Sequence, residues 1–453
     1  MTPPAGDSLL FLRRLGSAFS SILFVISLSA AEVPDKPAAV ARKALDLLLA
    51  EKYPDLRTML TPAAKDRLTI DFLHDRVGGE IHTFGQLNGI GDPVTAKDGD
   101  NTLVSFPVHF VVTRVYIQFT LDPSLQVAGL FLRPLEAPLP KVWQQPAYSK
   151  PDAFIQREVT VGSDEWKLGG TLTVPVGKGP FPGVVLVHGP GPNDRDEQIY
   201  SNRVFRDLAE GLASSGTAVL RYDKRTLTFS DKMGDMAFTI EQETVTDAVR
   251  AIGVMRSQPE VAKSRIFVLG HSLGGYAAPR IAASDGKLAG LIFFAANARP
   301  IEDVALAQNE YIANMDGNPA PQVEQRLEAL KAEVARVKNL QAGVPPPQIL
   351  LGLPGVYLLD LKGYDPAEQA KQLKIPLLFL QGGRDFQVTS KDFAIWKAAL
   401  ADRGNTVFKE YPALNNLFIS GEGKPGPSDY LKQGNVDSTV IADIASWIAH
   451  QGN

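Results

Sequence analysis

One short motif constrains the fold of this 453-residue chain more than any other feature. Residues 270–274 read Gly-His-Ser-Leu-Gly; they follow the apolar run 266–269 and precede an alanine-rich segment. A Gly-x-Ser-x-Gly pattern between a strand and a helix is typical of a nucleophile elbow, a sharp turn that holds a serine at its tip. The two glycines leave room for close approach of neighbouring backbones. Ser272 is therefore the candidate nucleophile.

The sequence around this motif alternates between strand and helix patterns. Apolar runs predict strands at 183–187, 218–222, 266–269, 291–295, 376–380 and 407–411, and periodic segments predict helices at 205–214, 243–255 and 440–449. Such alternation is the signature of an α/β fold with a mostly parallel sheet and helices on both faces. We assign this domain to residues 153–453.

Residues 301–350 interrupt that alternation. The segment 323–337 has a charged amphipathic helical pattern and is followed by a proline-rich stretch. Insertions of this kind between sheet strands are commonly lids or binding loops, so we expect a helical cap over the active face. A surface excursion that does not contact the substrate is the alternative.

A smaller domain is predicted before the α/β domain. Helical patterns at 38–49 and 69–77 precede strand patterns at 102–110, 115–119 and 127–132. This order indicates a small α+β domain over residues 35–133. Residues 134–152 are rich in proline and predict a stiff linker.

The first 31 residues resemble a secretory signal peptide. Arg13 and Arg14 precede the apolar stretch 15–28, and small residues follow at 29–31. A membrane anchor is the alternative, but the stretch is shorter than the ~20 residues that span a bilayer. We expect cleavage near Ala31, no stable membrane span afterwards, and a periplasmic or secreted protein.

Composition narrows the partners and cofactors. The chain has no cysteine, which excludes disulfides, thiolate metal sites and a lipid anchor on cysteine. Its net charge of −4 and 21% charged residues provide no basic surface for nucleic acid. We expect no metal and no cofactor, and a small-molecule ester or acyl compound as substrate. The oligomeric state stays open.

The oxyanion hole is expected in the loop that follows strand 183–187. In this architecture one donor is the backbone N–H of the residue after the nucleophile, here Leu273, and the other comes from this earlier loop. The loop contains Pro190, which has no backbone N–H and could not serve as the donor. Gly191 is the possible substitute.

Five segments together resemble a known family: 188–196, 205–208, 221–225, 270–275 and 381–385. They are similar to bacterial α/β-hydrolase-fold esterases that carry an N-terminal α+β domain, whose relatives are described as serine aminopeptidase-like or acylaminoacyl-peptidase-like hydrolases. The resemblance covers about residues 35–450. It implies the α/β-hydrolase fold, Ser272 as nucleophile, and Asp385 as the carboxylate that orients a histidine.

This chain departs from the family pattern at the histidine itself. The family motif Leu-Asn-His-Leu-Phe corresponds to Leu-Asn-Asn-Leu-Phe at 414–418, which places Asn416 at the base position. An amide has no basic lone pair, so Asn416 could hydrogen-bond to Ser272 and Asp385 but could not accept the serine proton. Pro190 is a second departure, because relatives usually have a small residue there.

No other histidine is expected to replace the missing base. His271 lies inside the elbow and normally points away from the nucleophile, His188 ends a strand and is usually structural, and His450 lies on the final helix. The three histidines of the smaller domain, His74, His82 and His109, are dispersed and lack the spacing of a zinc site. Residues 223–225 are expected to form a buried charge network.

Three functions remain open from sequence. The first is carboxylesterase-like hydrolysis of acyl esters through Ser272, impaired by the loss of the histidine. The second is a catalytically degenerate hydrolase that binds a small molecule or acts as a scaffold. The third is a peptidase, which rests only on the names of the relatives.

Overall fold

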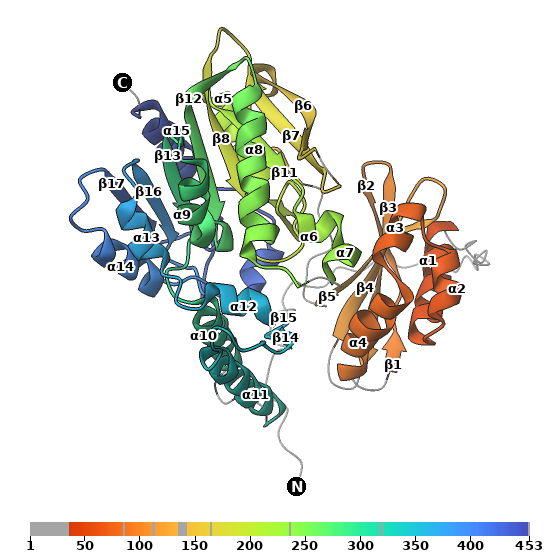
Figure 1. Cartoon of the computed structure of the whole chain (residues 1–453). Coiled ribbons are helices and arrows are strands. Elements are labelled where there is room, and N and C mark those ends of the chain that lie inside the picture. Colours follow the sequence, from red (N-terminus) through yellow and green to blue (C-terminus); the bar gives the residue numbers. More distant parts are fainter. Residues whose placement is uncertain are drawn as a thin grey trace, which may run out of the picture.

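The computed structural model describes residues 36–451 except 85–86, 111–113, 135–142, 164, 235–236, 316, 318 and 320. The predicted signal peptide lies outside these residues. Figure 1 shows a smaller N-terminal unit beside a larger unit built on one long sheet. Within the described part, no helix is both long and apolar enough to cross a membrane.

The N-terminal unit packs helices on one face of an antiparallel sheet. The helices are α1 (Lys36–Leu49), α2 (Tyr53–Thr58), α3 (Pro62–Arg67), η1 (Phe72–Gly78) and α4 (Gly79–Thr83). The strands are β1 (Leu87–Ile90), β2 (Val94–Asp98), β3 (Asn101–Phe110), β4 (Arg114–Leu121) and β5 (Val127–Pro134), with β1, β3, β4 and β5 in that order and β2 paired to β3. Alternate residues of β4, such as Ile117 and Phe119, are buried against the helices. β1 and β2 were not predicted, because their short sequences contain no run of apolar residues.

The described end of the predicted linker is fixed to the larger unit. The Trp143 indole N–H donates to Asp207 Oδ1 at 2.9 Å, and the Ser149 hydroxyl donates to Glu210 Oε2 at 2.6 Å. Both acceptors lie on α5 (Val204–Ser214). Residues 143–150 are thus tied to a helix of the larger unit by side-chain hydrogen bonds.

The larger unit contains an eight-stranded sheet in the order β17-β16-β13-β12-β8-β11-β7-β6. β7 runs antiparallel to both neighbours and the strands from β11 to β17 pair in parallel. The bounds are β6 (Phe154–Val161), β7 (Leu168–Pro175), β8 (Phe181–Val187), β11 (Ala218–Tyr222), β12 (Val261–His271), β13 (Gly290–Phe294), β16 (Leu377–Gly382) and β17 (Thr406–Tyr411). Every predicted strand of this domain is present. β6 and β7 were missed, since β6 at the sheet edge alternates with polar residues.

Helices cover both faces of this sheet, as predicted (Figure 1). α5 and α15 (Ser438–Ala449) pack on one face. The other face is covered by α8 (Thr246–Ser257), α9 (Leu273–Asp285), α13 (Pro366–Gln372) and α14 (Ser390–Ala399). Short elements complete the unit: β9 (Gln198–Ile199), β10 (Asn202–Arg203), α6 (Arg225–Thr228), α7 (Ser230–Gly234), η2 (Pro151–Ala153), η3 (Glu241–Val245) and η4 (Pro427–Leu431). This strand order, with β7 antiparallel beside a parallel run and helices on both faces, is that of the α/β-hydrolase fold.

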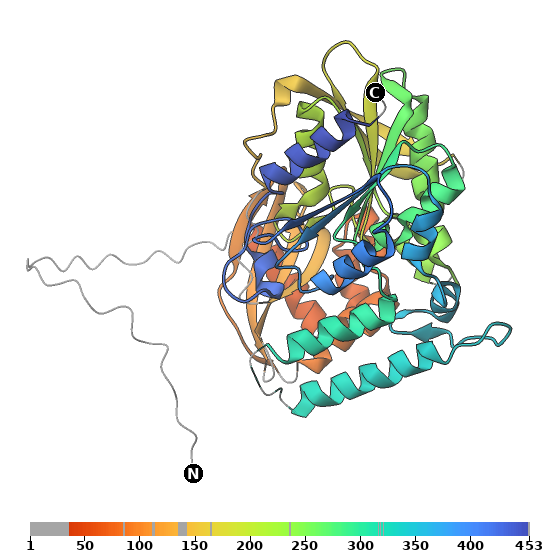
Figure 2. The ribbon, with the colours of Figure 1, turned by 90° about the vertical axis from the view of Figure 1, so that its left-hand side faces the viewer.

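The insertion is helical and lies at the end of the sheet where the parallel strands finish (Figures 1 and 2). It contains α10 (Ile301–Ala313), α11 (Pro321–Lys338), the hairpin of β14 (Ile349–Leu350) and β15 (Leu353–Pro354), and α12 (Gly355–Leu361). The Gln308 side-chain amide donates to the Gln387 carbonyl at 3.2 Å, and the Tyr311 and Phe386 rings stack with centroids 5.7 Å apart. α10 therefore covers the loop that follows β16.

Candidate active site

Ser272 lies at a strained turn between β12 and α9. Its backbone has φ 49° and ψ −114°, a combination that residues other than glycine rarely adopt. The turn is closely packed, because a Cβ on Gly274 would lie 2.2 Å from the Val187 carbonyl oxygen. The Ser272 N–H donates to the Phe294 carbonyl at 2.9 Å. The geometry is that of a nucleophile elbow, and no hydrogen bond to the Ser272 hydroxyl is found among the described residues.

Asp385 follows β16 and is 5% exposed. Its Oδ1 accepts the backbone N–H groups of Gln387 (2.8 Å) and Val388 (2.9 Å), which fix the carboxyl group in one orientation. Burial raises its pKa to about 7, and the hydrogen bonds from Asn416, Val388 and Gln387 oppose that rise.

Asn416 occupies a buried position between Asp385 and His271. Its side-chain Nδ2 donates to Asp385 Oδ2 at 2.7 Å, as a histidine Nδ1–H would. Its Oδ1 lies 3.1 Å from His271 Nε2. We expected hydrogen bonds to both Asp385 and Ser272. The contact to Asp385 is present, but the one to Ser272 is not found in the described structure, because the amide oxygen lies against His271.

His271 points into a buried acidic contact rather than toward the nucleophile. Its Nδ1 lies 2.8 Å from Glu197 Oε2, and its Nε2 faces the oxygen atoms of Asn416. Burial would lower the pKa of His271, but the Glu197 carboxylate and the hydrogen-bond acceptors outweigh it, so the pKa lies above its ordinary value. Burial would likewise raise the pKa of Glu197, and the charge of His271 outweighs it and lowers the pKa. The raised pKa and the short contact with the Glu197 carboxylate favour the protonated form of His271, and in that form it cannot act as a base.

The loop after β8 is held by the same buried groups. The Gly189 N–H donates to Glu197 Oε1 at 2.7 Å, and the Gly189 carbonyl accepts from Lys224 Nζ at 2.7 Å. The N–H of Gly189 is therefore already used, and Pro190 has none. Gly191 is half-buried, and a Cβ built on it would meet no heavy atom within 4 Å. No hydrogen bond of its N–H is found among the described residues. Leu273 begins α9, where the first N–H groups have no partner within the helix.

The expected buried charge network is present at Lys224 and Arg225, whereas Asp223 is partly exposed and pairs with Arg195 at 2.7 Å. Lys224 pairs with Glu243 at 2.7 Å, and the Tyr357 hydroxyl donates to the same carboxylate at 2.7 Å. Arg225 forms a two-pronged contact with Asp247, with Nε to Oδ2 at 2.8 Å. Because Lys224 also binds Gly189, this network fixes the loop after β8.

Four of the other five histidines are structural or on the surface, and His109 lies half-buried on β3. His188 is buried, with Nε2 3.0 Å from the Asp194 carbonyl, and burial lowers its pKa to about 4. His450 is exposed at the end of α15. His74 and His82 are exposed beside acidic side chains. No group of three metal-ligating side chains is found in the parts of the chain that the structure describes.

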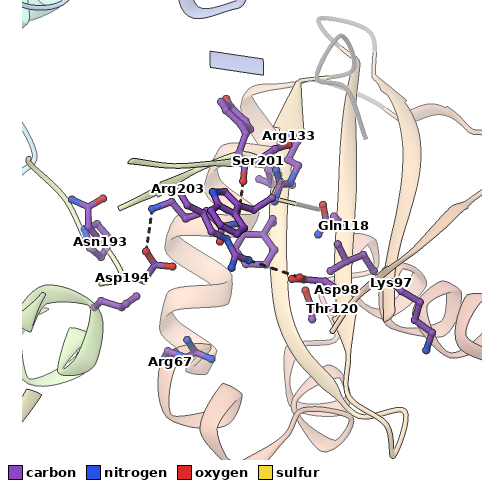
Figure 3. Close-up of a pocket in the computed structure, with 18 residues that line it drawn as sticks. Arg67, Lys97, Asp98, Gln118, Thr120, Arg133, Asn193, Asp194, Ser201 and Arg203 are labelled. Carbon is purple, nitrogen blue, oxygen red and sulfur yellow. Dashed lines mark hydrogen bonds and ion pairs between the residues drawn. The ribbon is translucent and has the colours of Figure 1, made fainter. Parts of the chain in front are cut away.

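Two features of this region were not foreseen. Glu197 has φ 47° and joins Gly189 to His271, yet its sequence context is only one more acidic residue after Asp-Arg-Asp. A cavity of about 490 Å³ also lies outside the elbow: it is lined by residues of the N-terminal sheet and of the loop 192–203, and Ser272 is not among its lining residues. Figure 3 shows this cavity.

Comparison with known proteins gives consistent relatives. Residues 183–414 match the family model described as serine aminopeptidase, S33. The chain is 37% identical to esterase EstD of Thermotoga maritima over 404 residues, which covers 88% of this chain and 92% of that protein. Among solved structures, the Pyrococcus furiosus esterase Pf2001 is similar over 69% of this chain and 97% of its own, with 15% identity and a TM-score of 0.43. Est1E from Butyrivibrio proteoclasticus is similar over 65% and 98%, with 16% identity and a TM-score of 0.42.

Proposed function

Because the chain belongs to the serine aminopeptidase (S33) family of α/β-hydrolases and is similar to an esterase, we propose that it is a carboxylesterase-like serine hydrolase. In this proposal Ser272 works without a general base. The observation that carries the proposal is the side chain of Asn416. It is bonded to Asp385 through Nδ2 and to His271 through Oδ1, so it is held at the base position and cannot take a proton.

The proposed reaction assigns each group one task. Ser272 Oγ attacks the acyl carbonyl carbon, and the Leu273 N–H donates to the oxyanion that forms. The serine proton passes to water or to the departing alkoxide, which leaves as the alcohol; water then hydrolyses the acyl-serine. Asp385 orients Asn416 instead of a histidine. Loss of the triad histidine costs on the order of 10⁶ in kcat, and ~10³–10⁴ of acceleration over water survives from the oxyanion hole and binding.

Esters are favoured over peptides as substrates. An alkoxide can depart with little assistance, whereas the amine of a peptide bond must be protonated as it leaves. In the triad the histidine supplies that proton, and Asn416 cannot. A peptidase activity would therefore suffer more from the substitution than an esterase activity.

A second candidate is a ligand-binding protein that no longer catalyses. The observation that favours it is the buried chain Asp385–Asn416–His271–Glu197, in which each donor faces an acceptor at 2.7–3.1 Å. Such a satisfied network is stable without any reaction. The two candidates differ in whether Ser272 still forms an acyl intermediate.

The test is hydrolysis of p-nitrophenyl butyrate by the mature protein and four variants: Ser272→Ala, Asn416→His, Asn416→Ala and the double variant Ser272→Ala/Asn416→His. We expect slow turnover that Ser272→Ala abolishes. Asn416→His should raise kcat/KM by ~10²–10⁴, the usual contribution of a positioned general base. Asn416→Ala is the matched control and should not gain activity.

Three outcomes separate the candidates. Turnover by the unmodified protein at an ordinary kcat of about 1–10³ s⁻¹, lost in Ser272→Ala, would show that a base exists and the proposal is wrong. Labelling of Ser272 by a fluorophosphonate probe supports the esterase. No labelling, together with no gain in Asn416→His, supports the binding protein.

We also propose that the protein is exported. The support is the pattern of residues 1–31: two arginines, an apolar stretch and a small-residue end. Expression in a bacterium followed by N-terminal sequencing of the periplasmic and culture fractions tests this. A mature chain beginning near residue 32 is expected, and full-length protein retained in the cytoplasm would contradict it.

A further inference from the structure

The cavity outside the elbow has the size and position of a separate binding site. It measures about 490 Å³, within the range of ~300–1,000 Å³ typical of small-molecule pockets. One wall is the face of the N-terminal sheet that the helices leave uncovered, and the other is the loop 192–203 between β8 and α5. In Figure 3, Gln118 and Lys97 lie on the sheet side, and Asn193 and Asp194 lie opposite. Binding sites often form at such junctions between two units.

The charges around the cavity are predominantly positive. Four cationic side chains line it (Arg67, Lys97, Arg133 and Arg203) against two carboxylates, Asp98 and Asp194. Arg203 lies 3.8 Å from Asp98, a contact that joins the two walls. Among the described residues, the hydrogen bond found for the Lys97 ammonium group goes to the neutral Thr102 hydroxyl at 2.8 Å. Arg203 also lies 3.6 Å from Asp196, outside the lining, so the excess of positive charge rests on Arg67, Lys97 and Arg133.

Arg133 has the greatest need of a partner. No acidic side chain pairs with it in the described residues, and its Nε is buried without a hydrogen bond. Its guanidinium lies instead near the rings of Phe131 (5.5 Å) and Tyr200 (5.8 Å). Burial lowers its pKa, although an arginine stays charged in a protein. Arg133 as a residue is half-buried, and a partly desolvated guanidinium without a counterion gains from an anion, which its planar fork can bind in two-pronged fashion.

Gln118 adds a second unsatisfied group on the same wall. Its residue is 1% exposed, and its Oε1 has no hydrogen-bond partner. It lies on β4 between Ile117 and Phe119, which face the opposite, apolar side of the sheet. A buried amide oxygen without a donor costs roughly as much as a lost hydrogen bond, so the ligand is expected to bring a hydroxyl group.

The opposite wall is held in place before any ligand arrives. β9 and β10 form a hairpin whose turn contains Tyr200 at φ 54°, a strained backbone for a bulky residue. Asn202 anchors the hairpin, since its side chain donates to the Tyr430 carbonyl at 2.9 Å and accepts from the Gly434 N–H at 2.9 Å. Trp143 and Tyr200 add aromatic surface to the lining. The contacts of Asn202 therefore hold the turn in its strained backbone conformation and keep Tyr200 at the cavity.

We propose that this cavity binds a hydroxylated carboxylate of the size of a sugar acid, with Arg133 taking the carboxylate, Gln118 the hydroxyl and the aromatic rings the carbon skeleton. The site is independent of Ser272 and of whether the elbow is catalytically active. It assigns the N-terminal unit a role in ligand recognition.

Isothermal titration calorimetry with the mature protein tests the proposal. The probes are D-glucuronate, D-glucose as its neutral counterpart, and inorganic phosphate as an anion without a carbon ring. We expect saturable binding of glucuronate and at least tenfold weaker binding of glucose. Phosphate binding as tight as glucuronate binding would overturn the assignment to a hydroxylated carboxylate, and so would the absence of glucuronate binding.

Variants locate the binding. Arg133→Gln should weaken glucuronate binding at least tenfold, and Arg133→Lys should give an intermediate loss because the charge remains without the fork. Gln118→Leu should weaken glucuronate more than phosphate. Arg42→Gln is the control: this exposed arginine of α1 pairs with Asp46 and does not line the cavity, so the variant should bind glucuronate within twofold of the unmodified protein. Unchanged affinity in a folded Arg133→Gln protein, checked by circular dichroism, would refute the site.

Discussion

The loop that carries Ser272 and the loop that carries Asn416 meet different requirements of the same reaction. The first keeps the positive φ of the serine and the glycine contacts that shape the turn. The second keeps its buried position and its hydrogen bond to Asp385, but its side chain cannot accept a proton. The comparison teaches that the geometry of this site is maintained by packing, which does not depend on the chemistry of residue 416.

The hydrogen bonds explain how the second loop stays ordered without a histidine. Asn415 Oδ1 accepts the backbone N–H groups of Leu417 (2.9 Å) and Ile419 (3.2 Å), which fixes the turn. The Asn416 side chain then bridges the Asp385 carboxyl group and the His271 imidazole, donating to the first through Nδ2 and offering Oδ1 to the second. An amide fits there because Asp385 requires a donor and His271 requires an acceptor. Four substitutions test whether the packing of this site is independent of its catalytic chemistry, from the largest expected effect to the smallest.

Gly274→Ala should damage the elbow most. The new Cβ would lie 2.2 Å from the Val187 carbonyl oxygen and 2.7 Å from that of His188, and neither backbone can move without shifting β8. We expect a loss of about 3 kcal/mol or more in the free energy of unfolding, measured by urea denaturation. Gly253→Ala is the control, because that exposed helical position has open space and alanine favours helices. Equal stability of the two variants would contradict the packing argument.

Glu197→Gln should disturb the contacts that join the loop after β8 to His271, the residue before the nucleophile. A glutamine can serve either Gly189 or His271 as acceptor, but its NH₂ group then faces the other donor. We expect a loss of about 2 kcal/mol at pH 6. The loss should shrink as pH rises, because the pKa of His271 is raised in the folded state and its contribution disappears once the imidazole is deprotonated.

Urea denaturation at pH 6 and pH 9 measures this effect. The matched control is Glu158→Gln: that carboxylate also pairs with a cation, Arg195, but its side chain is 75% exposed. Exposed pairs contribute little, so its stability should change by less than about 1 kcal/mol. A pH-independent loss in Glu197→Gln would mean that His271 is not charged.

Asp385→Asn should change how stability depends on pH. The folded protein holds the Asp385 proton up to about pH 7, whereas the unfolded chain releases it near its ordinary value of about 3.9. This carboxyl group therefore makes the protein less stable as pH rises from about 4 to 7, with no further change above. The asparagine variant lacks that decline, so relative to the unmodified protein it should gain about 2 kcal/mol between pH 5 and 7.5, at about 1.4 kcal/mol for each pH unit of the decline.

The measurement is the difference between the two proteins at each pH, which cancels the other titrating groups. Asp46→Asn on the surface of α1 is the control and should show a constant difference. Parallel curves for Asp385→Asn and the unmodified protein would contradict the effect of burial on this acid.

Local sequence was enough to predict the parts of the fold whose signals are local. The elbow at 270–274 and the buried parallel strands were predicted, since apolar runs and glycine spacing act over a few residues. β6 and β7 were missed because polar residues alternate along β6. β6 lies at the edge of the sheet, where one side is exposed and the apolar signal is weak. β7 is buried beside it, but its sequence Leu-Gly-Gly-Thr-Leu-Thr-Val-Pro has no continuous apolar run.

For the site, the sequence predicted individual residues but not the contacts between them. Asp385 was assigned by resemblance and by its place after a strand, and Asn416 by the motif around it. The contact between Asn416 and His271 was not foreseen, because it joins residues 145 apart and depends on which way an amide faces. The role of Glu197 depends on a backbone with φ 47°, and the cavity depends on how two units face each other. No sequence pattern encodes either.

Ser272→Gly should have the smallest effect and the opposite sign. A serine at φ 49° and ψ −114° is strained, while glycine adopts such backbone angles freely. The relief, about 1–3 kcal/mol for a residue in a sparsely populated region, is partly offset by the greater freedom of glycine in the unfolded chain, about 0.5–1 kcal/mol. We expect a net gain of about 1 kcal/mol in Ser272→Gly and no gain in Ser272→Ala, compared by thermal denaturation. A gain in glycine alone would show that the turn still stores strain for a serine that has lost its base, whereas equal stability of the two variants would show that the elbow is already relaxed.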